Sequence, residues 1–125
     1  MLNTYHGFPN SGLDIQQADL VRCRFVVRYK EQDFRLEHSP TVLSVYFGPH
    51  AEPAGLIKCG SSSSGAIWSY GRCIGDFSQE PDGNYYVTRI NANFLEPEAT
   101  VQADPVMYLL NSLLETCSPL KRQSQ

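Results

Sequence analysis

The fold class is decided by residues 20–37, which read LVRCRFVVRYKEQDFRLE. Apolar and polar side chains alternate over residues 20–30, and the alternation resumes over residues 33–37 after a polar turn. A period of two is typical of a half-buried β-strand, because successive side chains point to opposite faces of a sheet. The stretch therefore predicts an antiparallel β-hairpin.

The register of this hairpin follows from the need to keep its apolar side chains together. A connecting loop of two or four residues allows Tyr29 to pair with Phe34 and Val27 to pair with Leu36. All four side chains then lie on one face, because an even offset preserves the alternation. We expect this face to belong to the core.

Four later stretches are also typical of strands, because they are rich in β-branched and aromatic residues and are bounded by turn residues. They cover residues 41–47, 56–59, 66–77 and 85–95. Within the third stretch, Gly71 and Gly75 predict a bulge or the close approach of another group to the backbone. A Pro-Asp-Gly turn at residues 81–83 separates the last two stretches.

The clearest helical pattern begins at Asp104, which can cap a helix, and Pro105, which suits the first helical position. Apolar residues then recur at helical spacing and form one stripe, which consists of Val106, Leu109, Leu110, Leu113, Leu114 and Cys117. Ser118 and Pro119 are expected to end the helix, which would span about residues 105–117. Burial of its four leucines would contribute about 6–12 kcal/mol before the entropy cost.

These elements predict a single α+β domain, in which a five- to six-stranded antiparallel sheet, mostly a meander, is covered on one face by the C-terminal helix. The length of 125 residues fits one domain. Residues 1–19 are rich in turn residues and are interpreted as an N-terminal arm, with one helical turn possible over residues 13–19. The domain then covers residues 20–117, and residues 118–125 form a polar tail.

The composition excludes some classes of protein. Hydrophobic residues make up 42% of the chain, which argues against an intrinsically disordered protein. The net charge of −3 argues against a generally basic nucleic-acid-binding protein. The charge is uneven, because residues 76–115 carry seven acidic residues and one basic residue. That part of the chain is therefore the first place to look for a surface that binds a basic partner.

The sequence has no secretory signal, no lipidation motif and no apolar stretch long enough to cross a membrane, so a cytoplasmic protein is expected. Its four cysteines are widely spaced and include no CxxC pair; they are Cys23, Cys59, Cys73 and Cys117. A chain of this length can form its own core without covalent links. The cysteines are therefore interpreted as reduced, mostly buried thiols.

Motifs that carry common catalytic and cofactor chemistry are absent from the sequence, which predicts no cofactor and favours a non-enzymatic function. None of the three histidines stands at metal-ligand spacing from another His or Cys, so no metal site is predicted. A cysteine-dependent enzyme is an alternative, and Cys59 and Cys73 are the thiols whose reactivity would test it.

An aromatic and acidic stretch is the leading candidate for a functional surface. Its residues are Trp68, Tyr70, Tyr85 and Tyr86, together with Asp76, Glu80, Asp82, Glu96 and Glu98. Exposed Trp and Tyr side chains offer large contact areas at low entropic cost, and carboxylates complement a basic surface. We therefore predict a small protein-binding module, of the inhibitor, immunity or adaptor type, whose partner is a basic protein.

A basic row is the second candidate surface, and it consists of Arg22, Arg24, Arg28 and Lys30. The acidic side chains of Asp33 and Glu37 on the next strand would neutralise part of this row. A self-paired, solvated face is therefore expected rather than a nucleic-acid site. A different alternative is a small-ligand-binding protein, with an apolar pocket between a curved sheet and the helix.

Overall fold

The computed structural model describes residues 13–39, 41–48, 50–60, 64–90 and 100–123. Nine strands in this part of the chain form one antiparallel sheet, and each strand pairs with the next one in sequence. The strands are β1 (Asp14–Asp19), β2 (Arg24–Tyr29), β3 (Gln32–His38), β4 (Val42–Phe47), β5 (Gly55–Cys59), β6 (Ser64–Ser69), β7 (Arg72–Gln79), β8 (Tyr85–Arg89) and β9 (Thr100–Gln102). The helix α1 (Pro105–Gln123) follows. The predicted α+β class, meander topology and C-terminal helix are therefore confirmed.

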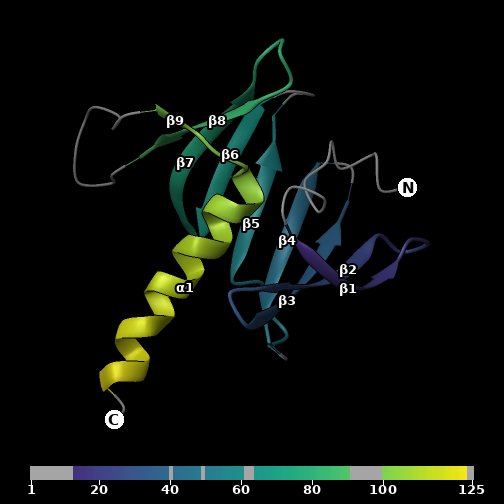
Figure 1. Cartoon of the computed structure of the whole chain (residues 1–125), viewed down its shortest axis with the longest axis vertical. Helices are drawn as coiled ribbons and strands as arrows, with labels where there is room; N and C mark the ends of the chain where they lie inside the picture. Colours follow the sequence, from purple (N-terminus) through teal and green to yellow (C-terminus); the bar gives the residue numbers. More distant parts are fainter. Residues whose placement is uncertain (1–12, 40, 49, 61–63, 91–99, 124–125) are drawn as a thin grey trace.

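The helix covers one face of the sheet and leaves the other face uncovered by it. Figure 1 shows α1 lying across β5 to β8, with β1 and β2 at the side of the sheet away from the helix. Its last turns extend beyond the sheet (Figure 1). The face that packs against α1 is called the inner face below, and the opposite one is called the outer face.

The predicted count of five to six strands was wrong, and one of the additional strands arises because residues 66–77 form two strands rather than one. Tyr70 and Gly71 lie between β6 and β7 with φ angles of 50° and 80°. Two consecutive residues in the left-handed region are typical of a type I′ hairpin turn. Gly71 therefore reverses the chain, whereas the sequence pattern predicted a bulge or a close approach at this position.

The first hairpin also differs from its prediction. Residues 14–19, which were assigned to an arm with one helical turn, form the edge strand β1 and pair with β2. The predicted strand over residues 20–30 is shortened to Arg24–Tyr29, because Cys23 adopts a φ of 55° and closes a turn. Val21 lies in this turn and is 93% exposed, although an alternating strand over residues 20–30 would place it on the same face as Phe25 and Val27.

The apolar side chains of the β2–β3 hairpin share one face, as expected, but the two strands pair in a register that differs from the predicted one. Lys30 and Glu31 form a two-residue turn with φ angles of 51° and 66°. Val27 therefore pairs with Phe34 rather than with Leu36. The shift of two residues preserves the alternation, so Val27, Phe34 and Leu36 are all fully buried on the inner face.

The C-terminal end of the sheet contains one strand that the sequence pattern missed. The predicted strand over residues 85–95 is described only as far as Arg89 in β8, and residues 91–99 lie outside the described ranges. The additional strand β9 pairs with β8 through Thr88 and Thr100, whose hydroxyl oxygens are 2.6 Å apart. The three residues of β9 are too few to show the alternation of apolar and polar side chains that identifies a strand in the sequence.

Asp104 caps the helix as predicted, whereas the predicted end of the helix was wrong. One carboxylate oxygen of Asp104 accepts hydrogen bonds from the backbone N–H groups of Val106 and Met107, at 2.9 and 3.1 Å. The helix continues through Pro119 to Gln123 instead of ending near residue 117. Pro119 lacks an N–H to donate, but its fixed φ is compatible with helical backbone.

The core lies between the inner face and the apolar stripe of α1. Val106, Leu109, Leu110 and Leu113 are all fully buried there. Gly55 lets the helix approach, because a Cβ at this position would stand 2.8 Å from a methyl group of Leu109. These side chains belong to the hydrophobic core, together with the buried side chains of the inner face. The alternative of a small-ligand pocket between sheet and helix stays a prediction.

Replacement of Asp104 by Ala is expected to lower the free energy of unfolding by about 1 kcal/mol, because two N–H groups of the first helical turn lose their acceptor. Urea denaturation of the wild type, Asp104→Ala and Asp104→Asn would measure the effect. Asparagine is an equivalent cap, so the Asn variant should keep nearly the wild-type stability. Equal stability of all three proteins would contradict the capping role.

Candidate functional site

The predicted aromatic and acidic residues do not form one continuous surface. Trp68, Asp76 and Tyr86 lie on the outer face of β6, β7 and β8, since their inner-face neighbours along each strand are buried. Tyr85 points to the inner face, where it packs half-buried against the core. Tyr70 is 56% exposed in the β6–β7 turn, at the opposite end of β7 from the acidic β7–β8 turn. Glu96 and Glu98 lie outside the described residues.

The aromatic side chains of β6 and β8 are not cross-strand neighbours, because β7 separates the two strands. Trp68 pairs with Leu56 on β5 and with Cys73 on β7. Tyr86 pairs instead with Ser78 and Gln102. The sequence pattern predicts one strand over residues 66–77, which would make the strands of Trp68 and Tyr86 neighbours; the turn at Tyr70 and Gly71 separates them.

The face of the Trp68 ring is already occupied by a cation of the same chain. The Lys58 ammonium lies 4.9 Å from the ring centroid. The indole Nε1 is buried and has no hydrogen-bond partner among the described residues. This face of the ring therefore already contacts a cation of the same chain and is less available to a cation of a partner.

Three exposed carboxylates, those of Asp76, Glu80 and Asp82, lie along the same β7–β8 hairpin as Tyr86. Asp76 faces Thr88, two residue pairs along the hairpin from the Ser78–Tyr86 pair. Glu80 and Asp82 stand in the turn that joins the two strands, and both are exposed. No ion pair within 4.0 Å of these carboxylates is formed by residues in the described ranges. We refer to Asp76, Glu80, Asp82 and Tyr86 as the acidic hairpin surface.

The backbone of this turn is ordered by hydrogen bonds, as the Pro-Asp-Gly sequence predicts. The Gly83 N–H donates to the Glu80 carbonyl at 2.8 Å, and the Asn84 N–H donates to the Asp82 carboxylate at 2.9 Å. Gly83 adopts a φ of 92°, which other residues rarely do. The carboxylates therefore project from a defined turn rather than from a variable loop.

The basic row is paired within its own sheet, as expected. Arg24 forms an ion pair with Glu37 at 3.4 Å, and Arg28 forms one with Asp33 at 2.9 Å. The hydrogen bond and charge of Arg28 lower the pKa of Asp33. Arg22 also pairs with an acidic residue, Asp19, at 3.0 Å, although it lies in the β1–β2 turn and not on the strand.

Lys30 does not lie with the arginines of the predicted basic row. It lies in the β2–β3 turn, where its ammonium donates a hydrogen bond to the Asn111 side chain at 2.8 Å. Tyr29 donates to the same Asn111 oxygen at 3.2 Å. Lys30 therefore ties the sheet to the helix instead of extending the outer-face row.

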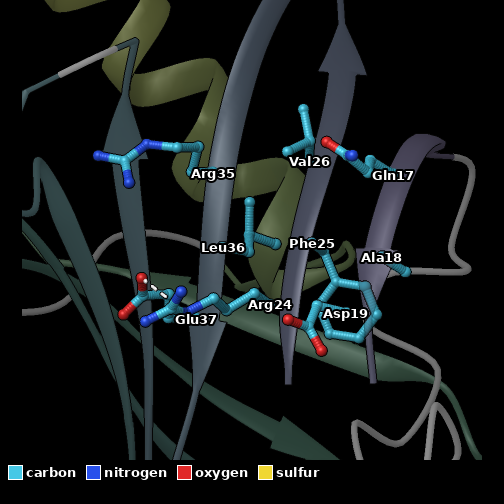
Figure 2. Close-up of a pocket in the computed structure, with 9 residues that line it drawn as sticks. All are labelled: Gln17, Ala18, Asp19, Arg24, Phe25, Val26, Arg35, Leu36 and Glu37. Atoms are coloured by element: carbon cyan, nitrogen blue, oxygen red, sulfur yellow. Dashed lines mark ion pairs between the residues drawn. The ribbon is translucent and has the colours of Figure 1, made fainter. Parts of the chain in front are cut away.

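An open depression of about 310 Å³ lies beside these pairs, on strands β1 to β3 (Figure 2). Its lining includes two arginines, Arg24 and Arg35, and two acids, Asp19 and Glu37. Figure 2 shows Arg24 reaching across β3 to Glu37, with their ion pair drawn as a dashed line. Because positive and negative groups balance, the depression does not favour a ligand of either charge.

The thiols give no support to a cysteine-dependent enzyme. Cys59 and Cys73 are free thiols, and the side chain of Cys117 lies outside the described part. Burial raises the pKa of the Cys59 thiol, which lowers the fraction of reactive thiolate. Within the described residues, no three His, Cys, Asp or Glu side chains are grouped so that they could hold a metal ion.

Comparison of the chain with protein-family models, curated proteins and solved structures gave no match. Within the ranges that the structure covers, no helix has the length and apolar character that a membrane crossing requires.

The hydroxyl of Tyr85 is expected to lose its proton only at high pH. Burial, with smaller contributions from the charges of Asp104 and Cys59, raises the pKa of Tyr85 to about 12 from an ordinary value of 10.0. The unfolded chain loses this proton first, so the stabilisation is complete below pH 10.0 and is lost as the pH rises toward 12. Denaturation midpoints over this range should fall less steeply for Tyr85→Phe than for the wild type. Identical slopes would show that Tyr85 ionises freely in the folded protein.

Proposed function

We propose that this protein is a small non-enzymatic binding module whose acidic hairpin surface recognises a basic surface on another protein. The observation that carries the proposal is the difference between the two charged regions of the outer face. The arginines of β2 are paired with acids of β3 at 3.4 and 2.9 Å. The carboxylates of the β7–β8 hairpin have no such partner among the described residues.

Charge complementarity supports this choice of partner. Exposed carboxylates without a compensating cation attract a basic surface and increase its rate of association. Tyr86 adds an aromatic side chain with a hydroxyl beside them, and such residues are enriched at binding hot spots. The rigid turn at Gly83 reduces the conformational entropy that the surface loses on binding.

The site differs from the one that the sequence predicted. Tyr70 and Tyr85 are not part of it, because they lie at the other end of β7 and on the inner face. Trp68 is not part of it either, since it lies on β6 and its ring contacts the Lys58 ammonium. The surface that we propose is therefore centred on the β7–β8 hairpin.

Affinity capture from a lysate of the source organism tests the proposal, with the tagged full chain as bait. The wild type should retain a stoichiometric partner with a basic surface that is released by moderate salt, since salt screens exposed charges. Asp76→Lys and Asp82→Lys should each reduce its recovery. Glu31→Lys makes the same change of charge in the exposed β2–β3 turn and should not. Equal recovery with all of these variants would overturn the proposal.

A further inference from the structure

The outer face of the sheet carries two opposite charges that are placed symmetrically about β6. Lys58 on β5 pairs with Ala66 on β6, and Ala66 pairs in turn with Asp76 on β7. All three side chains lie on the outer face, since a neighbour of each along its strand is buried on the inner face. A cation and an anion therefore stand in one cross-strand row, one strand away from β6 on either side.

The two charges of this row do not meet within one copy of the chain. Lys58 and Asp76 are both exposed, and neither forms an ion pair within the described ranges. Neighbouring strands lie about 4.8 Å apart, so about 10 Å separates the backbones of β5 and β7. Ala66 stands between them and has no polar side-chain atom to offer to either charge.

No other element of the described part of the chain lies over this row. The helix α1 packs on the inner face, and all nine strands belong to the same sheet (Figure 1). Beside the row, Leu56 and Trp68 pair across β5 and β6 and are only partly buried. An uncovered sheet face with apolar side chains at its centre and charges beside them is suited to pack against a second sheet.

We infer that the outer face binds a second copy of this chain, in a symmetric dimer whose two-fold axis runs along β6. This axis brings Lys58 of each copy opposite Asp76 of the other, because the two residues lie in one row on opposite sides of β6. Two identical ion pairs then form, as a closed two-fold interface requires. Ala66 lies on the axis, where its small side chain allows the two sheets to approach.

Charge complementarity favours a second copy over an unrelated protein, because the charges of this face complement those of an identical face. The inference goes beyond the proposed function and does not depend on it. Asp76 belongs to both surfaces, whereas Asp82 stands in the β7–β8 turn, away from the row. Substitutions at these two residues therefore distinguish the dimer from the binding of a basic protein.

Sedimentation equilibrium of the full chain over a series of concentrations tests this inference. The wild type should show a reversible monomer–dimer equilibrium that added salt weakens. Lys58→Glu and Asp76→Lys should each raise the dissociation constant of the dimer by at least about tenfold, because the symmetry turns both attractive pairs into repulsive ones. An equimolar mixture of the two variants should dimerise about as tightly as the wild type, since both pairs of the mixed dimer are attractive again.

Asp82→Lys is the matched control for Asp76→Lys. It makes the same change of charge in the same hairpin and should leave the dimer unchanged, although it should reduce capture of the basic partner. Lys58 and Asp76 are exposed, so their variants should keep the circular dichroism of the wild type.

Three results would each overturn the inference. They are a wild type that stays monomeric at every concentration, a dimer that both variants leave unchanged, and a mixture of variants that dimerises no more tightly than each variant alone. A monomeric wild type whose captured partner is lost on Lys58→Glu would assign the face to an unrelated protein. The capture result with Asp82→Lys is separate from all of these, so failure of the dimer and failure of the proposed function are distinguishable.

Discussion

A chain that ends at residue 103 is expected to be insoluble or unfolded. It lacks α1, whose side chains Val106, Leu109, Leu110 and Leu113 are fully buried against the sheet. Burial of four such residues contributes about 6–12 kcal/mol before entropy costs. A whole domain is typically stable by only about 5–15 kcal/mol. Loss of the helix therefore removes an amount of free energy comparable to the whole free energy of unfolding. It also exposes an apolar sheet face, which promotes aggregation.

Expression of this fragment beside a chain that ends at Glu115 provides the measurement. The longer chain keeps all the helix residues that are known to be buried, and it should remain soluble with native-like circular dichroism. The shorter chain should be found in inclusion bodies or should show no cooperative thermal transition. A soluble 1–103 fragment that melts cooperatively would refute the role assigned to the helix.

Replacement of Gly65 by Ala is expected to destabilise the protein by about 3 kcal/mol or more. Gly65 pairs with Cys59 on β5 and with Phe77 on β7. An added Cβ would overlap the Lys58 carbonyl oxygen and would stand 2.9 Å from both the Cys59 Cα and a ring carbon of Phe77. Two of these obstacles belong to the backbone of β5, so relief requires separation of two paired strands rather than rotation of a side chain.

Chemical denaturation of Gly65→Ala and Gly60→Ala would measure this effect. Among the described residues no atom outside the chain neighbours lies within 4 Å of a Cβ built on Gly60, so its variant should keep the wild-type stability to within about 0.5 kcal/mol. The midpoint for Gly65→Ala should be clearly lower than that for Gly60→Ala. If the two variants have the same denaturation midpoint, β5, β6 and β7 are not packed around Gly65 as closely as the structure shows.

Sequence patterns were sufficient for the features that depend on side-chain alternation. The inner face of β2 and β3 follows from a period of two, and this period survives an error of two residues in the register of Val27 and Phe34. The helix cap at Asp104 follows from a local hydrogen-bonding preference. Both kinds of feature are encoded by neighbouring residues.

Features that depend on backbone conformation were not predictable in the same way. The β6–β7 hairpin turns at Tyr70 and Gly71, and nothing in the type of residue 70 signals a left-handed φ. The Tyr-Gly pair was the one available signal, because Gly suits the second position of such a turn. Without this turn, Trp68 and Tyr86 would lie on neighbouring strands. The predicted aromatic and acidic surface therefore included residues that lie away from the β7–β8 hairpin.

The pairing of charges was partly predictable. Adjacent strands with opposite charges on one face predict ion pairs, and Arg24–Glu37 and Arg28–Asp33 are such pairs. The position of Lys58 over Trp68 was not anticipated, because it depends on the pairing of β5 with β6. An open cavity of about 530 Å³, which His50 and Tyr70 help to line, likewise depends on two turns that are distant in sequence.

The central claim is that the acidic hairpin surface binds a basic protein, and the affinity of the captured partner tests it most directly. The dissociation constant would be measured by titration calorimetry for the wild type, for Asp76→Lys/Asp82→Lys and for Glu31→Lys. Charge reversal at the hairpin should weaken binding by at least about tenfold, because it places like charges against the partner. Glu31→Lys should change the affinity little. A hairpin variant that binds as tightly as the wild type would contradict the claim.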